Sequence, residues 1–82
     1  MATIFRTGRF RVVIYSKDHR PPHVHVIGTG NAAKIALGEP GRNPFLVAND
    51  GLSRKQLATV LREIEEKQTL LLQRWRDIHG DA

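Results

Sequence analysis

Three of the four histidines in this 82-residue chain lie within seven consecutive positions, from His19 to His25, around a pair of prolines. Imidazole is the one side chain whose unperturbed pKa, about 6.5, lies near neutral pH, so it can exchange protons, bind metal ions or contact phosphate. The prolines restrict two backbone φ angles and would hold His19 at a defined position relative to His23. This segment is the first candidate for a functional site.

A strand expected over His23–Ile27 would separate the histidines from the valines between them, because side chains alternate between the two faces of a strand. Valines belong against the core, so we expect His23 and His25 to point into water from the open face of the sheet. The same alternation in neighbouring strands adds Arg11, Tyr15 and Lys34 to that face.

Histidine, lysine, arginine and tyrosine together can cleave RNA without a metal ion. A base takes the proton of the 2′-hydroxyl, cations stabilise the charge on phosphorus, and an acid protonates the leaving oxygen. The candidate catalytic residues are therefore His23, His25 and His19, and the candidate phosphate or substrate contacts are Arg20, Lys34, Arg11 and Tyr15.

Two other interpretations of the histidines remain open. In the first, His23 and His25 share a metal ion, with His19 as a third ligand or Asp18 as a carboxylate ligand. The absence of cysteine and of a second nearby carboxylate ranks this lower, so we expect no metal and no cofactor. In the second, a histidine hydrogen-bonds a backbone carbonyl and only shapes the loop.

The charges of the chain are unevenly distributed. Residues 1–62 carry ten Lys or Arg side chains against three acidic ones, whereas residues 63–82 carry three against five. A basic body of this kind predicts an anionic partner, with nucleic acid as the first expectation and an acidic protein as the second.

Length and composition predict one domain over residues 1–82. The chain has no cysteine, its first residues lack the apolar run of a signal peptide, and no segment approaches the roughly 20 apolar residues that span a bilayer. We therefore expect a cytoplasmic protein without disulfides and without a membrane partner.

The first half of the chain alternates with period two, as strands do. Strands are expected at Thr3–Arg6, Phe10–Tyr15, His23–Ile27 and Ala32–Leu37, and Pro44–Val47 could add a short edge strand. The residues Asn49–Gly51 are expected to form a turn, and the polar, glycine-rich residues Gly38–Asn43 a loop.

The second half is helical in pattern. Ser53 and Gln56 have the spacing of a capping box, and an apolar stripe follows at helical spacing. A second stripe, which includes Trp75, differs in phase from the first around Lys67, and this predicts two helices or one kinked helix. The expected fold is α+β, an antiparallel sheet of three to four strands packed on these C-terminal helices.

The three leucines at positions 70–72 exceed what one face of a helix buries in so small a domain. They predict a protein partner or homo-oligomerisation through the C-terminal helix.

Four segments resemble a small bacterial family known as domain of unknown function 4160. They are TIFR at residues 3–6, the strand at residues 10–16, DHRPPHVHV at residues 18–26, and GLSRKQL at residues 51–57, which leads into a helix ending near Trp75. The resemblance covers nearly the whole chain, and its most specific element contains His19, Pro21, Pro22, His23 and His25. The chain departs from the family at Gly38–Pro44, where a more acidic, strand-like stretch is usual.

The resemblance also implies a function. Genes of this family often lie beside a gene for a domain of unknown function 2442 protein, and the pair is regarded as a type II toxin–antitoxin module. This implies a toxin-like protein that is restrained by an antitoxin-like partner. Action on RNA is expected from the histidines and the cations around them, not from the resemblance. The alternative is a non-catalytic module that binds nucleic acid or protein, as the regulatory half of such a pair.

Overall fold

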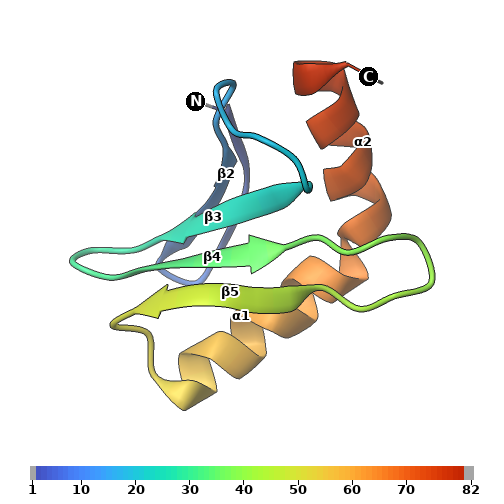
Figure 1. Cartoon of the computed structure of the whole chain (residues 1–82). Coiled ribbons are helices and arrows are strands. Elements are labelled where there is room, and N and C mark those ends of the chain that lie inside the picture. Colours follow the sequence, from blue (N-terminus) through green and yellow to red (C-terminus); the bar gives the residue numbers. More distant parts are fainter. Residues whose placement is uncertain (1, 81–82) are drawn as a thin grey trace.

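The chain up to Asp50 forms five strands in a computed structural model that describes residues 2–80 (Figure 1). The strands are β1 (Ala2–Thr7), β2 (Phe10–Ile14), β3 (His23–Ile27), β4 (Ala32–Ala36) and β5 (Phe45–Asp50). They form one antiparallel sheet in the order β1-β2-β3-β4-β5, so each strand pairs with its neighbour in sequence.

The sheet has five strands, whereas the sequence predicts three to four. The additional strand is β5, which pairs along the whole of β4. It begins after Pro44, which has no backbone N–H to donate, and it includes Asn49 and Asp50, which were predicted as a turn. All six of its residues are exposed, so the alternation that reveals a half-buried strand is missing there. Residues 38–43 form a loop, as the sequence predicts.

The C-terminal region forms two helices, α1 (Arg54–Glu66) and α2 (Gln68–His79), which break at Lys67. The capping box is present: the Gln56 backbone N–H donates to Ser53 Oγ at 3.1 Å, and the Ser53 N–H donates to Gln56 Oε1 at 2.8 Å. Both donors would otherwise have no partner at the start of the helix. The predicted α+β fold is therefore confirmed, and of the two alternatives for its C-terminal part, two helices or one kinked helix, the structure has two helices.

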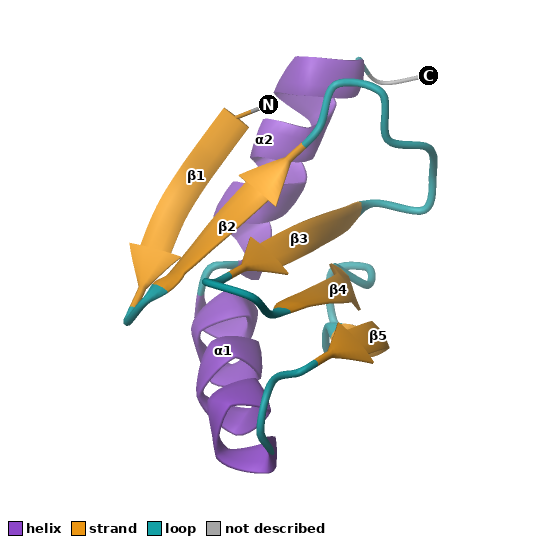
Figure 2. Ribbon diagram, turned by 90° about the vertical axis from the view of Figure 1, so that its left-hand side faces the viewer, coloured by secondary structure: helices purple, strands orange, loops and turns teal. Residues whose placement is uncertain are grey.

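Both helices lie on the same side of the sheet (Figure 2). The valines of β3, Val24 and Val26, are fully buried on that side, as the alternation predicts. They belong to a core that joins sheet and helices and contains Val12, Ile14, Val24, Val26, Ile35, Ile64, Leu71 and Trp75. Neither described helix is long and apolar enough to cross a membrane.

Candidate functional site

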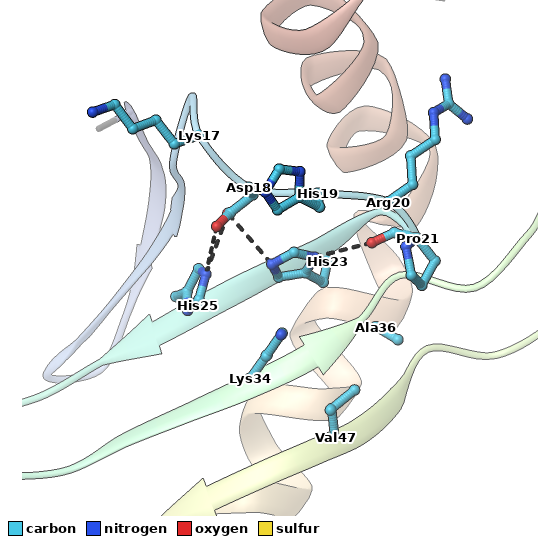
Figure 3. A pocket seen from close by; sticks show the side chains of 10 residues that line it. All are labelled: Lys17, Asp18, His19, Arg20, Pro21, His23, His25, Lys34, Ala36 and Val47. Carbon is cyan, nitrogen blue, oxygen red and sulfur yellow. Dashed lines mark hydrogen bonds and ion pairs between the residues drawn. The ribbon is translucent and has the colours of Figure 1, made fainter. Parts of the chain in front are cut away.

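A cavity of about 300 Å³ lies where the loop between β2 and β3 folds back over the sheet (Figure 3). Its lining consists of residues 17–21 of the loop, His23 and His25 of β3, Lys34 and Ala36 of β4, and Val47 of β5. The β3–β4 register places His25 opposite Lys34 and His23 opposite Ala36, so these four side chains share one face of the sheet.

The carboxylate of Asp18 is the centre of the site. Its Oδ2 atom accepts a hydrogen bond from the Tyr15 backbone N–H at 3.1 Å. The Nε2 atom of His25 lies 3.2 Å from Oδ2 and 3.3 Å from Oδ1, and the Nε2 atom of His23 lies 3.4 Å from Oδ2. One carboxylate thus faces two imidazoles.

Burial withdraws the Asp18 carboxyl from water, and this alone would raise its pKa. The Tyr15 N–H hydrogen bond, the hydrogen bond with His25, and the charges of His25 and His23 act in the opposite direction. Together they outweigh burial, so the pKa of Asp18 lies below its ordinary value and the group is a carboxylate at neutral pH.

The hydrogen bond made by Nδ1 of His23 decides the tautomer of that ring. Nδ1 lies 2.9 Å from the carbonyl oxygen of Pro21, and a carbonyl only accepts, so Nδ1 carries the hydrogen. In the neutral imidazole, Nε2 is then left with a lone pair that points at the Asp18 carboxylate. Two acceptors then face each other at 3.4 Å, an arrangement that a cation between them would stabilise.

His25 is the more accessible of the two imidazoles, with 26% of its side chain exposed. Its ring meets the Tyr15 ring edge-on at a centroid distance of 4.7 Å and the His23 ring at 5.1 Å. These contacts and the Asp18 carboxylate restrict the orientation of the ring.

The expectation that both imidazoles point into water is wrong for His23, which is only 5% exposed. Alternation along β3 selects the face of the sheet but does not determine what covers it. Here the loop that carries Asp18 lies over the ring, and the Trp75 ring of α2 packs against it at 5.3 Å. Val13, which pairs with His25 across β2 and β3, is likewise fully buried.

Trp75 and His79 support the site from α2. Their rings stack at 3.8 Å, and the His79 ring nitrogens lie 3.1 Å from the carbonyl oxygens of Trp75 and Tyr15. The end of α2 is thereby joined to Tyr15, whose own N–H holds Asp18. The sequence predicts Trp75 on the apolar stripe of the second helix, but not this connection.

The predicted cationic residues are only partly brought together. Lys34 points toward the two imidazoles in Figure 3, and Arg20 lines the mouth of the pocket with its guanidinium turned outward. Arg11 pairs with Ile27, at the opposite end of β3 from His23, and does not line the pocket.

The other predicted residues also differ in position. His19 lines the pocket but is not part of the group formed by Asp18, His23 and His25, and Tyr15 contacts the site through its ring and backbone. Lys17, at the rim, was not predicted as a site residue. The sequence indicates Asp18 only as an alternative metal ligand, although its place beside the histidines is a usable signal.

The fold and the pocket define a small α+β domain with a histidine–carboxylate site under a proline-containing loop. Residues 10–76 match the family described as domain of unknown function (DUF4160), and the chain belongs to that family. The match confirms the family resemblance and includes every residue that lines the pocket. Neither the curated proteins nor the solved structures contain a match to the chain.

Proposed function

We propose that this protein acts on RNA at the pocket beneath the β2–β3 loop, as the toxin-like member of a type II toxin–antitoxin pair in the bacterial cytoplasm. The observation that supports the proposal is the position of Lys34. This cation points into a pocket that also holds an imidazole, His25, hydrogen-bonded to a carboxylate, Asp18. Phosphodiester cleavage uses a proton acceptor and a cation in this combination.

We assign His25 as the proton acceptor for the RNA 2′-hydroxyl. Its Nε2–H donates to Asp18, which leaves Nδ1 unprotonated in the neutral ring, and a quarter of the side chain is exposed to a substrate. Asp18 orients the ring, as a carboxylate does for histidine in other acid–base sites.

His19 and Lys34 complete the proposed reaction. His19 is exposed and lines the pocket, so it can return a proton to the leaving oxygen, and Lys34 binds the charged phosphate. His23 is buried against Trp75, and we assign it the positioning of Asp18 rather than a contact with substrate.

Cleavage of labelled RNA by the purified protein, with and without EDTA, tests this proposal. We expect cleavage that His25→Ala slows about 100-fold or more and that Lys34→Ala also slows, because general acid–base catalysis contributes 10²- to 10⁴-fold. Arg11→Ala is the matched control, since it removes a cation outside the pocket and should cleave like the wild type.

Expression in bacteria should arrest growth for the wild type and for Arg11→Ala, but not for His25→Ala. Intact RNA after incubation with the wild type under both conditions would refute the catalytic proposal. If the RNA is bound but not cleaved, the alternative of a non-catalytic binding module replaces it.

The partner in this proposal is an antitoxin-like protein of the domain of unknown function 2442 type, with homo-oligomerisation through the C-terminal helix as the second prediction. Leu71 and Leu72 are buried, so of the leucine run only Leu70, which is 45% exposed, is free to contact a partner. Co-expression should relieve the growth arrest and yield a complex that Leu70→Lys weakens. Failure of the two proteins to co-purify would contradict the predicted pair.

A further inference from the structure

We infer that Asp18, His23 and His25 form a binding site for one divalent transition-metal ion. One nitrogen from each imidazole and one carboxylate oxygen lie within 4.8 Å of one another, and the three side chains converge on the same point in Figure 3. The inference does not depend on the proposed action on RNA, because metal binding is measured with no RNA present.

The distances around Asp18 fit a shared metal ion as well as they fit an ion pair. Charge-assisted hydrogen bonds between nitrogen and carboxylate oxygen are usually about 2.7–2.9 Å long. Here Nε2 of His25 and Nε2 of His23 lie 3.2 and 3.4 Å from Oδ2 of Asp18. Metal–ligand bonds of about 2.0–2.1 Å at tetrahedral angles separate neighbouring ligand atoms by roughly 3.3 Å. The two spacings from Asp18 are therefore close to those between ligand atoms around an ion, and the two imidazole nitrogens lie within 4.8 Å of each other.

The tautomer of His23, set by its hydrogen bond to Pro21, supports the same conclusion. Because Nδ1 donates its hydrogen to the Pro21 carbonyl at 2.9 Å, the neutral ring presents the lone pair of Nε2 to the carboxylate. A metal ion is a cation that both atoms can bind at once. The side chain is also only 7% exposed, so bulk water hardly solvates that lone pair.

The ligands are held by the interactions that usually fix metal-binding side chains. A ligating histidine normally donates its other ring N–H to a carbonyl or carboxylate, as His23 does to Pro21. Asp18 is likewise fixed by the Tyr15 N–H. The site is thus positioned before any ion arrives, and ordering these two side chains on binding requires little free energy.

Two imidazoles and one carboxylate suit zinc and the other late divalent first-row metals better than calcium or magnesium, which prefer oxygen ligands. Three protein ligands leave coordination positions open to the cavity. Lys34 points toward this space, which weakens cation binding but favours an anion such as phosphate as the next ligand.

A bound ion occupies Nε2 of His25 and displaces its hydrogen bond to Asp18. Metal binding and the proposed role of His25 as a proton acceptor therefore exclude each other in one molecule. EDTA in the RNA assay separates the two cases: it leaves cleavage by His25 unchanged or faster, and it abolishes cleavage that needs the ion.

Titration of tag-free protein, stripped with EDTA and dialysed, tests the site directly. We expect calorimetry with ZnCl₂ to give one ion per chain and the Tm to rise with zinc. We expect CoCl₂ to produce visible d–d absorption without a thiolate charge-transfer band, because the chain has no cysteine. Absence of zinc and cobalt binding to the wild type would overturn the inference.

Matched histidine variants identify the ligands. His25→Ala should weaken zinc binding at least tenfold, whereas His19→Ala, which removes a histidine from the same pocket, should bind like the wild type. Because His25 is partly exposed, its removal should leave the fold intact, and circular dichroism checks this. Equal zinc affinity in His25→Ala and the wild type, or an equal loss in His19→Ala, contradicts the ligand assignment.

The proposed action on RNA and the proposed metal site can each be refuted without refuting the other. Zinc binding by a protein that leaves RNA intact keeps the metal site and removes the function. Cleavage of RNA by a protein that binds neither zinc nor cobalt removes the metal site and keeps the proposed function.

Discussion

At the scale of single residues, Asp18 makes the contacts that join the other members of the site. It accepts a backbone N–H and faces two imidazoles, and it does so from a loop rather than from the strand that carries both histidines. Contacts at both ends restrict the path of that loop. The Tyr15 carbonyl oxygen lies 3.1 Å from Nε2 of His79 on α2, and the Pro21 carbonyl oxygen accepts a hydrogen bond from Nδ1 of His23 at 2.9 Å. A loop position supported in this way can hold a carboxylate at a defined distance from its partners.

The lowered pKa of Asp18 predicts how stability changes with pH in the metal-free protein. A group whose pKa is lower in the folded state stabilises the fold above its unfolded-state pKa, and this contribution is lost as the pH falls through the folded-state value. The ordinary value is 3.8, so the loss begins near pH 4 and continues below it.

Urea unfolding of the wild type and of Asp18→Asn, in EDTA between pH 2 and pH 7, measures this effect. Asparagine can still accept the Tyr15 N–H, so the comparison isolates the charge facing His23 and His25. We expect the wild type to be more stable above pH 5 and the difference to shrink toward pH 2. A difference that does not change with pH over this range contradicts the assignment.

At the scale of elements, the start of α1 depends on its capping box. Ser53→Ala removes the acceptor for the Gln56 N–H and should lower the free energy of unfolding by about 1 kcal/mol. Thr59→Ala is the control, because its exposed hydroxyl donates only to a Lys55 carbonyl in the same helix and its loss should change stability by less than about 0.5 kcal/mol. Similar urea midpoints for Ser53→Ala and the wild type would contradict this role of the cap.

The start of α2 is linked to the loop between β4 and β5 by Gln68. Its Nε2 amide donates to the carbonyl oxygens of Leu37 at 2.7 Å and Arg42 at 2.6 Å, and it lies 3.3 Å from that of Glu39. One side chain therefore satisfies carbonyls of a loop that contributes no strand or helix of its own.

Gln68→Glu replaces this donor with a carboxylate of the same shape, which cannot donate to carbonyls. We expect a loss of about 1–3 kcal/mol in urea unfolding and faster amide exchange in residues 38–43. Thr69→Glu adds the same charge at the next, exposed position and should have little effect. If both variants lose equal stability, the effect comes from charge and not from the hydrogen bonds.

At the scale of the whole molecule, the excess positive charge and the position of Lys34 in the pocket both predict that RNA binding weakens as the salt concentration rises. Neutralising phosphates releases counterions, so log K falls linearly with log salt concentration, by about 0.7 for each phosphate contact on a single strand. Lys34→Ala should reduce this slope by about 0.7 if Lys34 contacts a phosphate. Lys55→Ala, at an exposed position of α1 that does not line the pocket, is the control.

Fluorescence anisotropy with a short single-stranded RNA, between 50 and 300 mM salt, measures both slopes. If Lys55→Ala reduces the slope as much as Lys34→Ala does, binding depends on the net charge and not on the pocket.

The sequence by itself determined the features that depend on residues a few positions apart. The alternation in β2 and β3 follows from apolar residues at period two, and the start of α1 follows from Ser53 and Gln56. The break near Lys67 follows from the change of phase between two apolar stripes. Such signals are local, so no knowledge of the rest of the fold is needed to use them.

Only the tertiary structure decided which of the candidate residues meet. The β2–β3 register places Arg11 away from the pocket, and the path of the loop brings Asp18 to both imidazoles. The packing of Trp75 buries His23. Each of these depends on contacts between residues far apart in the chain, and a pattern within one strand carries no information about what its partner strand, loop or helix places beside it.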